Sequence, residues 1–225
     1  MIGSDLTVLW LSAKVAVCCV LISLPFGLAL GAILARFEFR GKSLLDGICH
    51  LPLVLPPVVT GYLLLMVFGR RGPIGSLLEG VMGMHLAFDW KGAVLASAVV
   101  GFPLMLRAIR QGFESIDPRL EAAARTLGAK PIIAFRSVTL RLALPAVGVG
   151  CLLSFARSLG EFGATITFVS NIPGETQTLP LAVFSYLNQP GGNAAAVRLV
   201  AISITLSFLA ILASNRLGIY LRKDR

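Results

Sequence analysis

The sequence predicts an all-α polytopic membrane protein with about five transmembrane helices. Of its 225 residues, 56% are hydrophobic and only 14% are charged, which is less charge than a soluble domain of this size carries. Several apolar runs approach the roughly 20 residues needed to cross the hydrocarbon core of a bilayer. The formal net charge of +9 would suggest nucleic-acid binding in a soluble protein, but no basic stripe with interleaved aromatic residues is present. We therefore expect a lipid bilayer as partner, and no nucleic acid.

Hydropathy and breaker residues place the expected spans at residues 6–35, 44–68, 92–109, 131–159 and 194–219. The second span contains Pro52, Pro56 and Pro57, so this helix is expected to be bent or broken. The third is expected to be interrupted at Pro103. Between the fourth and fifth spans, we expect a loop and a short surface or re-entrant helix at residues 179–187.

The distribution of basic residues predicts the orientation in the membrane. Five spans would place residues 36–42, 107–141 and 216–225 on one side, and these segments hold fourteen of the 20 Lys and Arg, against five on the other side. Short loops rich in Lys and Arg stay in the cytoplasm. The N-terminus is therefore expected to be periplasmic and the C-terminus cytoplasmic. Residues 8–217 are expected to form a single transmembrane domain, followed by a basic cytoplasmic tail at residues 218–225.

A short polar helix is expected between the third and fourth spans. Asp117 is a good N-cap, Pro118 suits the first helical position, and Gly128 is a natural stop. Ten residues give a helix of about 15 Å, too short to span a bilayer. Leu120 and Leu127 fall on one narrow apolar stripe. We expect this helix to lie at the membrane surface and to fit a groove on another protein.

This segment, EAAARTLG followed by VTLRLALP, resembles the coupling loop of ABC-importer permeases. The family pattern is EAA, three residues, G, nine residues, IxLP; here the glycine lies seven residues after Glu121 instead of six. The resemblance implies a type I ABC importer permease fold in which this cytoplasmic coupling helix docks into the ATPase subunit. The residues that it implies for this contact are Glu121, Ala123, Ala124, Arg125, Thr126, Leu127, Gly128 and Ala129.

Four further blocks extend the resemblance along nearly the whole chain: LPLVLPPVVTGYLLL, GRRGPIG, SFARSLGEFGATITF and NIPGETQTLP are similar to molybdate permease subunits. The resemblance implies a homodimer in a bacterial inner membrane, with two copies of a cytoplasmic ABC ATPase and a periplasmic molybdate-binding protein. The sequence contains no G-x-x-x-x-G-K-[ST] motif, so ATP and Mg are expected to be used by the partner ATPase. We expect no cofactor and no metal on this chain itself. Sulfate, thiosulfate or tungstate is the alternative substrate, because those permeases share several blocks.

Ionisable and hydroxyl residues near the outer end of the fourth span are candidates for a gate or a pathway. Arg157 and Glu161 are four residues apart and can pair on one face of a helix. They could line the path, or they could fix a helix end as a structural pair. Ser158 and Thr165 could face a polar path or bond back to helix carbonyls. An intramembrane enzyme is a remote alternative, because Ser158 has no histidine at a matching depth.

The outer loops are where a periplasmic binding protein would dock. Candidate contacts are Arg70 and Arg71 in the first loop, and Pro173 and Glu175 in the second. The two arginines would attract an oxyanion, but they could equally be ordinary loop charges.

Overall fold

The computed structural model describes residues 2–223, and every regular element in this range is helical. The elements are α1 (Ile2–Arg36), α2 (Lys42–Val54), α3 (Pro57–Phe68), α4 (Pro73–Met82), α5 (Trp90–Glu114), α6 (Pro118–Thr126), α7 (Pro131–Ala134), the π-helical segment η1 (Phe135–Leu140), α8 (Arg141–Leu159), α9 (Gly163–Val169), α10 (Leu179–Leu187) and α11 (Asn193–Lys223). The all-α class expected from the composition is confirmed.

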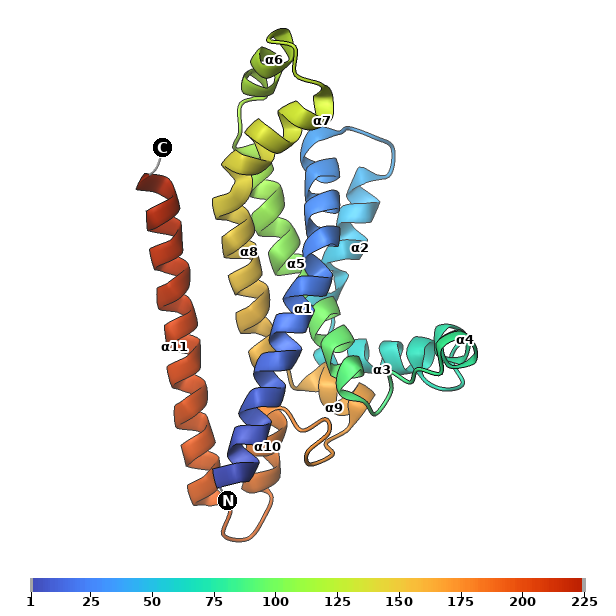
Figure 1. Cartoon of the computed structure of the whole chain (residues 1–225). Helices are drawn as coiled ribbons and strands as arrows, with labels where there is room; N and C mark the ends of the chain where they lie inside the picture. The colour runs from blue at the N-terminus through green and yellow to red at the C-terminus, as the bar shows by residue number, and fades with distance from the viewer. Residues whose placement is uncertain (1, 224–225) are drawn as a thin grey trace.

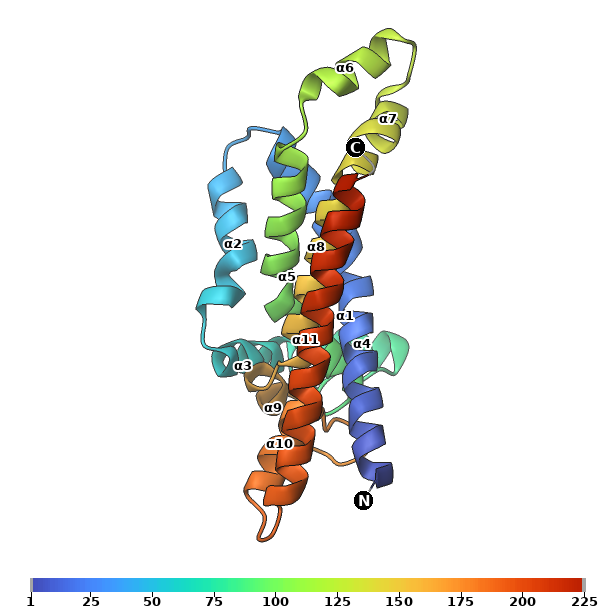
Figure 2. The same ribbon diagram turned by 90° about the vertical axis from the view of Figure 1, so that its left-hand side faces the viewer.

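Helices α1, α5 and α8 form the centre of the molecule and run side by side, while α6 projects beyond them at one end (Figures 1 and 2). The N-terminus and α10 lie at the opposite end (Figure 1). Helix α5 is the most enclosed of the three, and its Met105, Ile109 and Phe113 pack with Ala143 and Val147 of α8 in one apolar cluster. The bundle is therefore built around α5.

Three helical stretches are long and apolar enough to cross a membrane: Asp5–Arg36, Trp90–Glu114 and Pro131–Leu159. The pair α2 and α3 meets the same criterion together, with a bend of 114° between its halves. Helix α11 adds a further apolar stretch, Asn193–Leu209. These elements correspond in order to the expected spans.

One expectation about the third span is wrong. Helix α5 runs without a break from Trp90 to Glu114, and Pro103 lies buried inside it. Proline removes one backbone donor, but in a helix packed on its neighbours the continuity of the remaining bonds can be retained. The helix also ends five residues later than expected, because the polar residues after Ile109 continue it as far as Glu114.

The break in the second span is a corner, sharper than a kink. Helix α2 ends at Val54 and α3 begins at Pro57, which suits the first position of a helix. Helix α3 then packs on α9, a short helix that we did not expect in the loop before residues 179–187. A Cβ on Gly61 would lie 2.6 Å from the carbonyl oxygen of Ala164, so the two backbones touch. A Cβ on Gly163 would likewise lie 2.7 Å from a side-chain carbon of Pro57.

Helix α11 is fastened to α1 near the N-terminal end of the chain. The guanidinium of Arg198 lies 2.6 Å from a carboxylate oxygen of the buried Asp5. Residues 218–223 of the expected basic tail continue α11 as helix, and residues 224–225 lie outside the described part of the chain.

Candidate coupling site and charged clusters

Helix α6 has the two ends that its sequence predicts. The Asp117 side chain accepts a hydrogen bond of 2.9 Å from the backbone N–H of Arg119, and Pro118 occupies the first helical position. At the other end, the N–H of Ala129 donates to the carbonyl of Ala124, and Gly128 adopts φ +92°. This pair of features is a Schellman cap, in which a left-handed residue closes the helix. The polypeptide therefore forms a short helix with both ends fixed.

The outer surface of α6 and the turn after it are exposed and partly apolar. Leu127 is 89% exposed, and Leu120, Ile132 and Ile133 are also exposed. Ala123, Arg125, Thr126 and Gly128 are exposed as well, whereas Ala124 and Ala129 are half-buried. Large apolar side chains gathered on a protruding element mark an interaction surface. The surface is thus suited to dock into a partner.

Glu121 differs from its neighbours, because its carboxylate is engaged within its own chain. Thr139 is fully buried in η1 and donates a hydrogen bond of 2.7 Å to Glu121. The guanidinium of Arg36, at the end of α1, lies 3.9 Å from the same oxygen and 3.5 Å from the Thr139 hydroxyl. We call these three residues the Glu121 brace. They connect α6 to both α1 and the helix that leads into α8.

The gate candidates cluster where α8 meets α9. Arg157 lies 2.8 Å from Glu161, whose side chain is 1% exposed. The other carboxylate oxygen of Glu161 accepts from the N–H of Ala164, in the first turn of α9. The hydroxyl of Thr165 donates to the backbone carbonyls of Glu161 and Phe162, immediately before α9. This geometry favours the structural interpretation of the pair, because Glu161 caps α9 and Arg157 balances its charge. Ser158 is buried beside them.

The four candidates for binding-protein contacts lie on two exposed turns. Arg70 and Arg71 occupy the turn between α3 and α4, and Pro173 and Glu175 occupy the loop between α9 and α10. Both turns are in the half of the molecule away from α6 (Figure 1). That these turns contact a periplasmic binding protein stays a prediction.

One charged cluster escaped the sequence analysis. Arg110 of α5 pairs with Asp46 of α2 at 3.0 Å and with Glu114 at 2.7 Å. His50, which stands apart from other histidines in the sequence, lies 3.3 Å from the Asp46 carboxylate. The spacings of four between Asp46 and His50, and between Arg110 and Glu114, were visible in the sequence. The contact between the two helices was not, because it joins residues far apart in the chain.

Comparison with known proteins shows the family to which this architecture belongs. Residues 27–218 match the family model described as "Binding-protein-dependent transport system inner membrane component". The chain is 57% identical over 208 residues to the molybdenum transport system permease protein ModB of Escherichia coli strain K12, covering 92% of this chain and 91% of that protein. It is 36% identical over 196 residues to the sulfate transport system permease protein CysT of Salmonella typhimurium, covering 86% and 70%.

Solved structures show the same fold. The inward-facing methionine ABC transporter MetNI superposes with a TM-score of 0.76 at 15% identity, covering 98% of this chain and 97% of that chain. A bacterial alginate ABC transporter in complex with a periplasmic protein that binds an alginate pentasaccharide superposes with a TM-score of 0.73 at 14% identity, covering 95% and 77%. The protruding α6 and the packed helices behind it thus belong to a known architecture. The chain is a member of the family of binding-protein-dependent transport system inner membrane components.

Proposed function

We propose that this chain is the membrane-spanning subunit of an ATP-driven importer that carries molybdate across the bacterial inner membrane. The observation that supports this substrate most strongly is the 57% identity to a molybdenum transport permease over nearly the full length of both chains. Sulfate is the second candidate, supported by the more distant sulfate permease at 36% identity. Tungstate is a further alternative, because its tetrahedral oxyanion resembles molybdate.

The partners in this proposal are a second copy of the chain, two cytoplasmic ATPase subunits and a periplasmic molybdate-binding protein. The exposed apolar surface of α6 supports an ATPase contact, which would involve the outward residues Ala123, Arg125, Thr126, Leu127 and Gly128. The absence of a phosphate-binding G-x-x-x-x-G-K-[ST] motif from the sequence supports ATP hydrolysis by that partner. A binding protein would meet the turns that carry Arg70 and Glu175. In this arrangement the N-terminus is periplasmic and the C-terminus is cytoplasmic.

Coupling would proceed through contacts internal to the chain. When the ATPases close, they move α6, and the Glu121 brace passes the displacement to the end of α1 and to η1. Helix α8 continues directly from η1, and α1 and α8 both pack on α5. A rigid-body shift of packed helices is an established route from a small local change to a change of access. The pathway itself needs only weak sites, since conduction requires that the anion leave again.

Uptake of radiolabelled molybdate by cells that carry this permease and its ATPase partner tests the proposal. Molybdate uptake should exceed sulfate uptake, and competition by sulfate and by tungstate ranks the alternatives. Gly128→Pro should abolish uptake while leaving the protein in the membrane, because proline cannot adopt φ +92° and lacks the N–H that caps α6. Gly80→Ala is the control, since Gly80 is helical with no atom near its Cβ position. Undiminished uptake by Gly128→Pro would refute the assignment of α6.

A further inference from the structure

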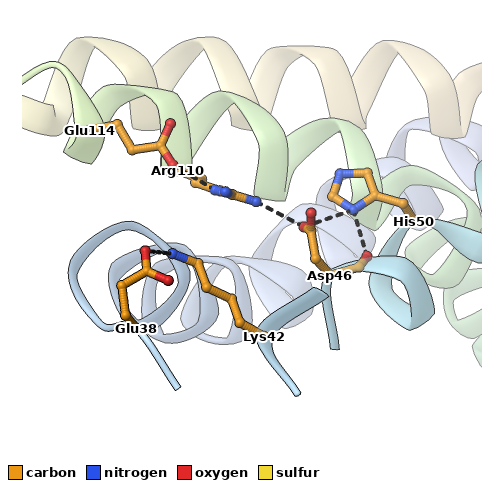
Figure 3. A network of polar contacts seen from close by, with 6 residues as sticks. All are labelled: Glu38, Lys42, Asp46, His50, Arg110 and Glu114. Carbon is orange, nitrogen blue, oxygen red and sulfur yellow. Dashed lines mark hydrogen bonds and ion pairs between the residues drawn. The ribbon is translucent and has the colours of Figure 1, made fainter. Parts of the chain in front are cut away.

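A charged crevice lies between α2 and α5 at the end of the molecule from which α6 projects. Figure 3 shows Arg110 of α5 extending toward Asp46 of α2. Glu114 pairs with Arg110 at one end of this row of side chains, and His50 contacts Asp46 at the other end. Helix α2 begins at Lys42 and α5 ends at Glu114, so the crevice opens at the ends of both helices.

The crevice holds a cavity of about 310 Å³, lined by Asp46, His50, Arg107, Arg110, Gln111 and Glu114. A water molecule occupies about 30 Å³ in the liquid, so this space corresponds to roughly ten water molecules. It therefore admits a five-atom tetrahedral anion together with part of its hydration shell. All six lining residues are polar or charged, in contrast to the apolar composition of the chain as a whole.

The donors in this cavity suit an oxyanion. Among the residues whose side chains the structure describes, the exposed Arg107 forms no ion pair and no hydrogen bond, and it lies one turn before Arg110. Two guanidinium groups on one helix face offer forked N–H donors that match tetrahedral oxyanions, and the Gln111 amide adds further N–H groups.

The carboxylates determine how tightly such an anion would be held. Asp46 and Glu114 occupy Arg110 when no anion is present, at 3.0 Å and 2.7 Å. Glu114 is 45% exposed, so its side chain can turn toward solvent and release one edge of the guanidinium. An entering anion competes with Glu114 for the guanidinium of Arg110, and Glu114 pairs with Arg110 again when the anion leaves. Binding is consequently weak and reversible, as passage through a transporter requires.

We propose that this cavity is a transient binding site for a tetrahedral oxyanion, held by Arg107 and Arg110 in exchange with Glu114. Two sources share this chemistry, a free anion in transit and the phosphate of a lipid headgroup at the same membrane face. The assignment of the free anion as molybdate rests on the proposed function above, whereas the oxyanion site itself rests on the geometry of the cavity.

Binding of ⁹⁹Mo-molybdate to the full chain in phosphatidylcholine nanodiscs, followed by scintillation proximity, tests the site directly. Arg107→Gln should weaken binding by about tenfold or more, the loss expected for one charge-assisted hydrogen bond. Glu114→Gln should tighten binding several-fold by removing the competitor. Lys42→Gln is the matched control. It removes a positive charge from the same end of the molecule, but Lys42 pairs with Glu38 outside the cavity. The Lys42→Gln variant should bind molybdate with the same affinity as the wild type.

A second arm identifies the source of the anion. The same variants are placed in nanodiscs that contain phosphatidylglycerol, and native mass spectrometry counts the anionic lipids that stay bound. Retention that depends on Arg107, without molybdate binding, assigns the site to the headgroup phosphate. If neither molybdate nor phosphatidylglycerol binding differs between Arg107→Gln, Arg110→Gln and the control, the site does not exist. Molybdate import by the whole transporter would remain intact in that case, so failure of the site is separable from failure of the proposed function.

Discussion

Replacing Glu121 by alanine is expected to free α6 from the bundle and to uncouple ATP hydrolysis from transport. The hydrogen bond from the buried Thr139 to the Glu121 carboxylate is 2.7 Å long, and a hydrogen bond to a charged group contributes about 1.5–3 kcal/mol. The ion pair with Arg36 is longer, at 3.9 Å, and the carboxylate is 25% exposed, so it adds about 0.5 kcal/mol at most. The total is about 2 kcal/mol, a roughly 30-fold rise in the population of detached α6.

Two measurements follow this change. Amide hydrogen exchange across α6 should accelerate in Glu121→Ala, and the molybdate transported per ATP hydrolysed by the assembled importer should fall. Glu121→Gln retains an acceptor oxygen and should lie between wild type and alanine. Glu38→Gln is the control, because Glu38 is 88% exposed and its pair with Lys42 is a surface interaction on the same side.

A double-mutant cycle with Thr139→Val decides whether the brace acts as a unit. If the two side chains stabilise α6 through one bond, the double variant should lose little more than either single variant, with a coupling energy of about 1–2 kcal/mol. Strictly additive losses, or exchange in Glu121→Ala equal to that of the wild type, would refute the reasoning.

Three further outcomes are expected. Glu161→Ala should lower the thermal unfolding temperature, by a destabilisation of about 2 kcal/mol, because it removes the side-chain cap of α9 and leaves the half-buried Arg157 without its ion-pair partner; an unchanged temperature would contradict this. Gly61→Val should prevent a stable fold, since a Cβ there lies 2.6 Å from the carbonyl oxygen of Ala164, while Gly80→Val in open space should fold normally. Asp5→Asn should accelerate amide exchange in α11, since its carboxylate holds that helix through an ion pair of 2.6 Å; exchange equal to wild type would show the pair to be dispensable.

Local signals in the sequence predicted the local structures well. The helix at residues 179–187 and the start of the fourth span at Pro131 agree with α10 and α7. The caps of α6 follow from Asp117 and Gly128, because capping depends on a few neighbouring residues and their backbone conformation. Such features need no knowledge of the rest of the fold.

Features that depend on distant contacts were not predictable in the same way. The sequence predicts an interruption at Pro103, but α5 packs on α1 and α8 and continues as helix through this proline. The orientation of Glu121 depends on Thr139 and Arg36, which approach it only in the folded chain. Asp46 and Arg110, which pair across the α2–α5 crevice, are likewise far apart in sequence, so periodicity within either helix could not reveal this contact.

The glycine contacts between α3 and α9 have a mechanical consequence. Where backbone meets backbone with no side chain between, there is no soft layer that could shear, so the two helices must travel together as a single block. The block is also fixed to the bundle, because Leu64 of α3 and Phe168 of α9 lie in one buried apolar cluster with Val100 of α5. The Glu161 cap lies next to Gly160, where α8 ends and the chain enters this block, so a substitution there would loosen the connection between α8 and both helices of the block.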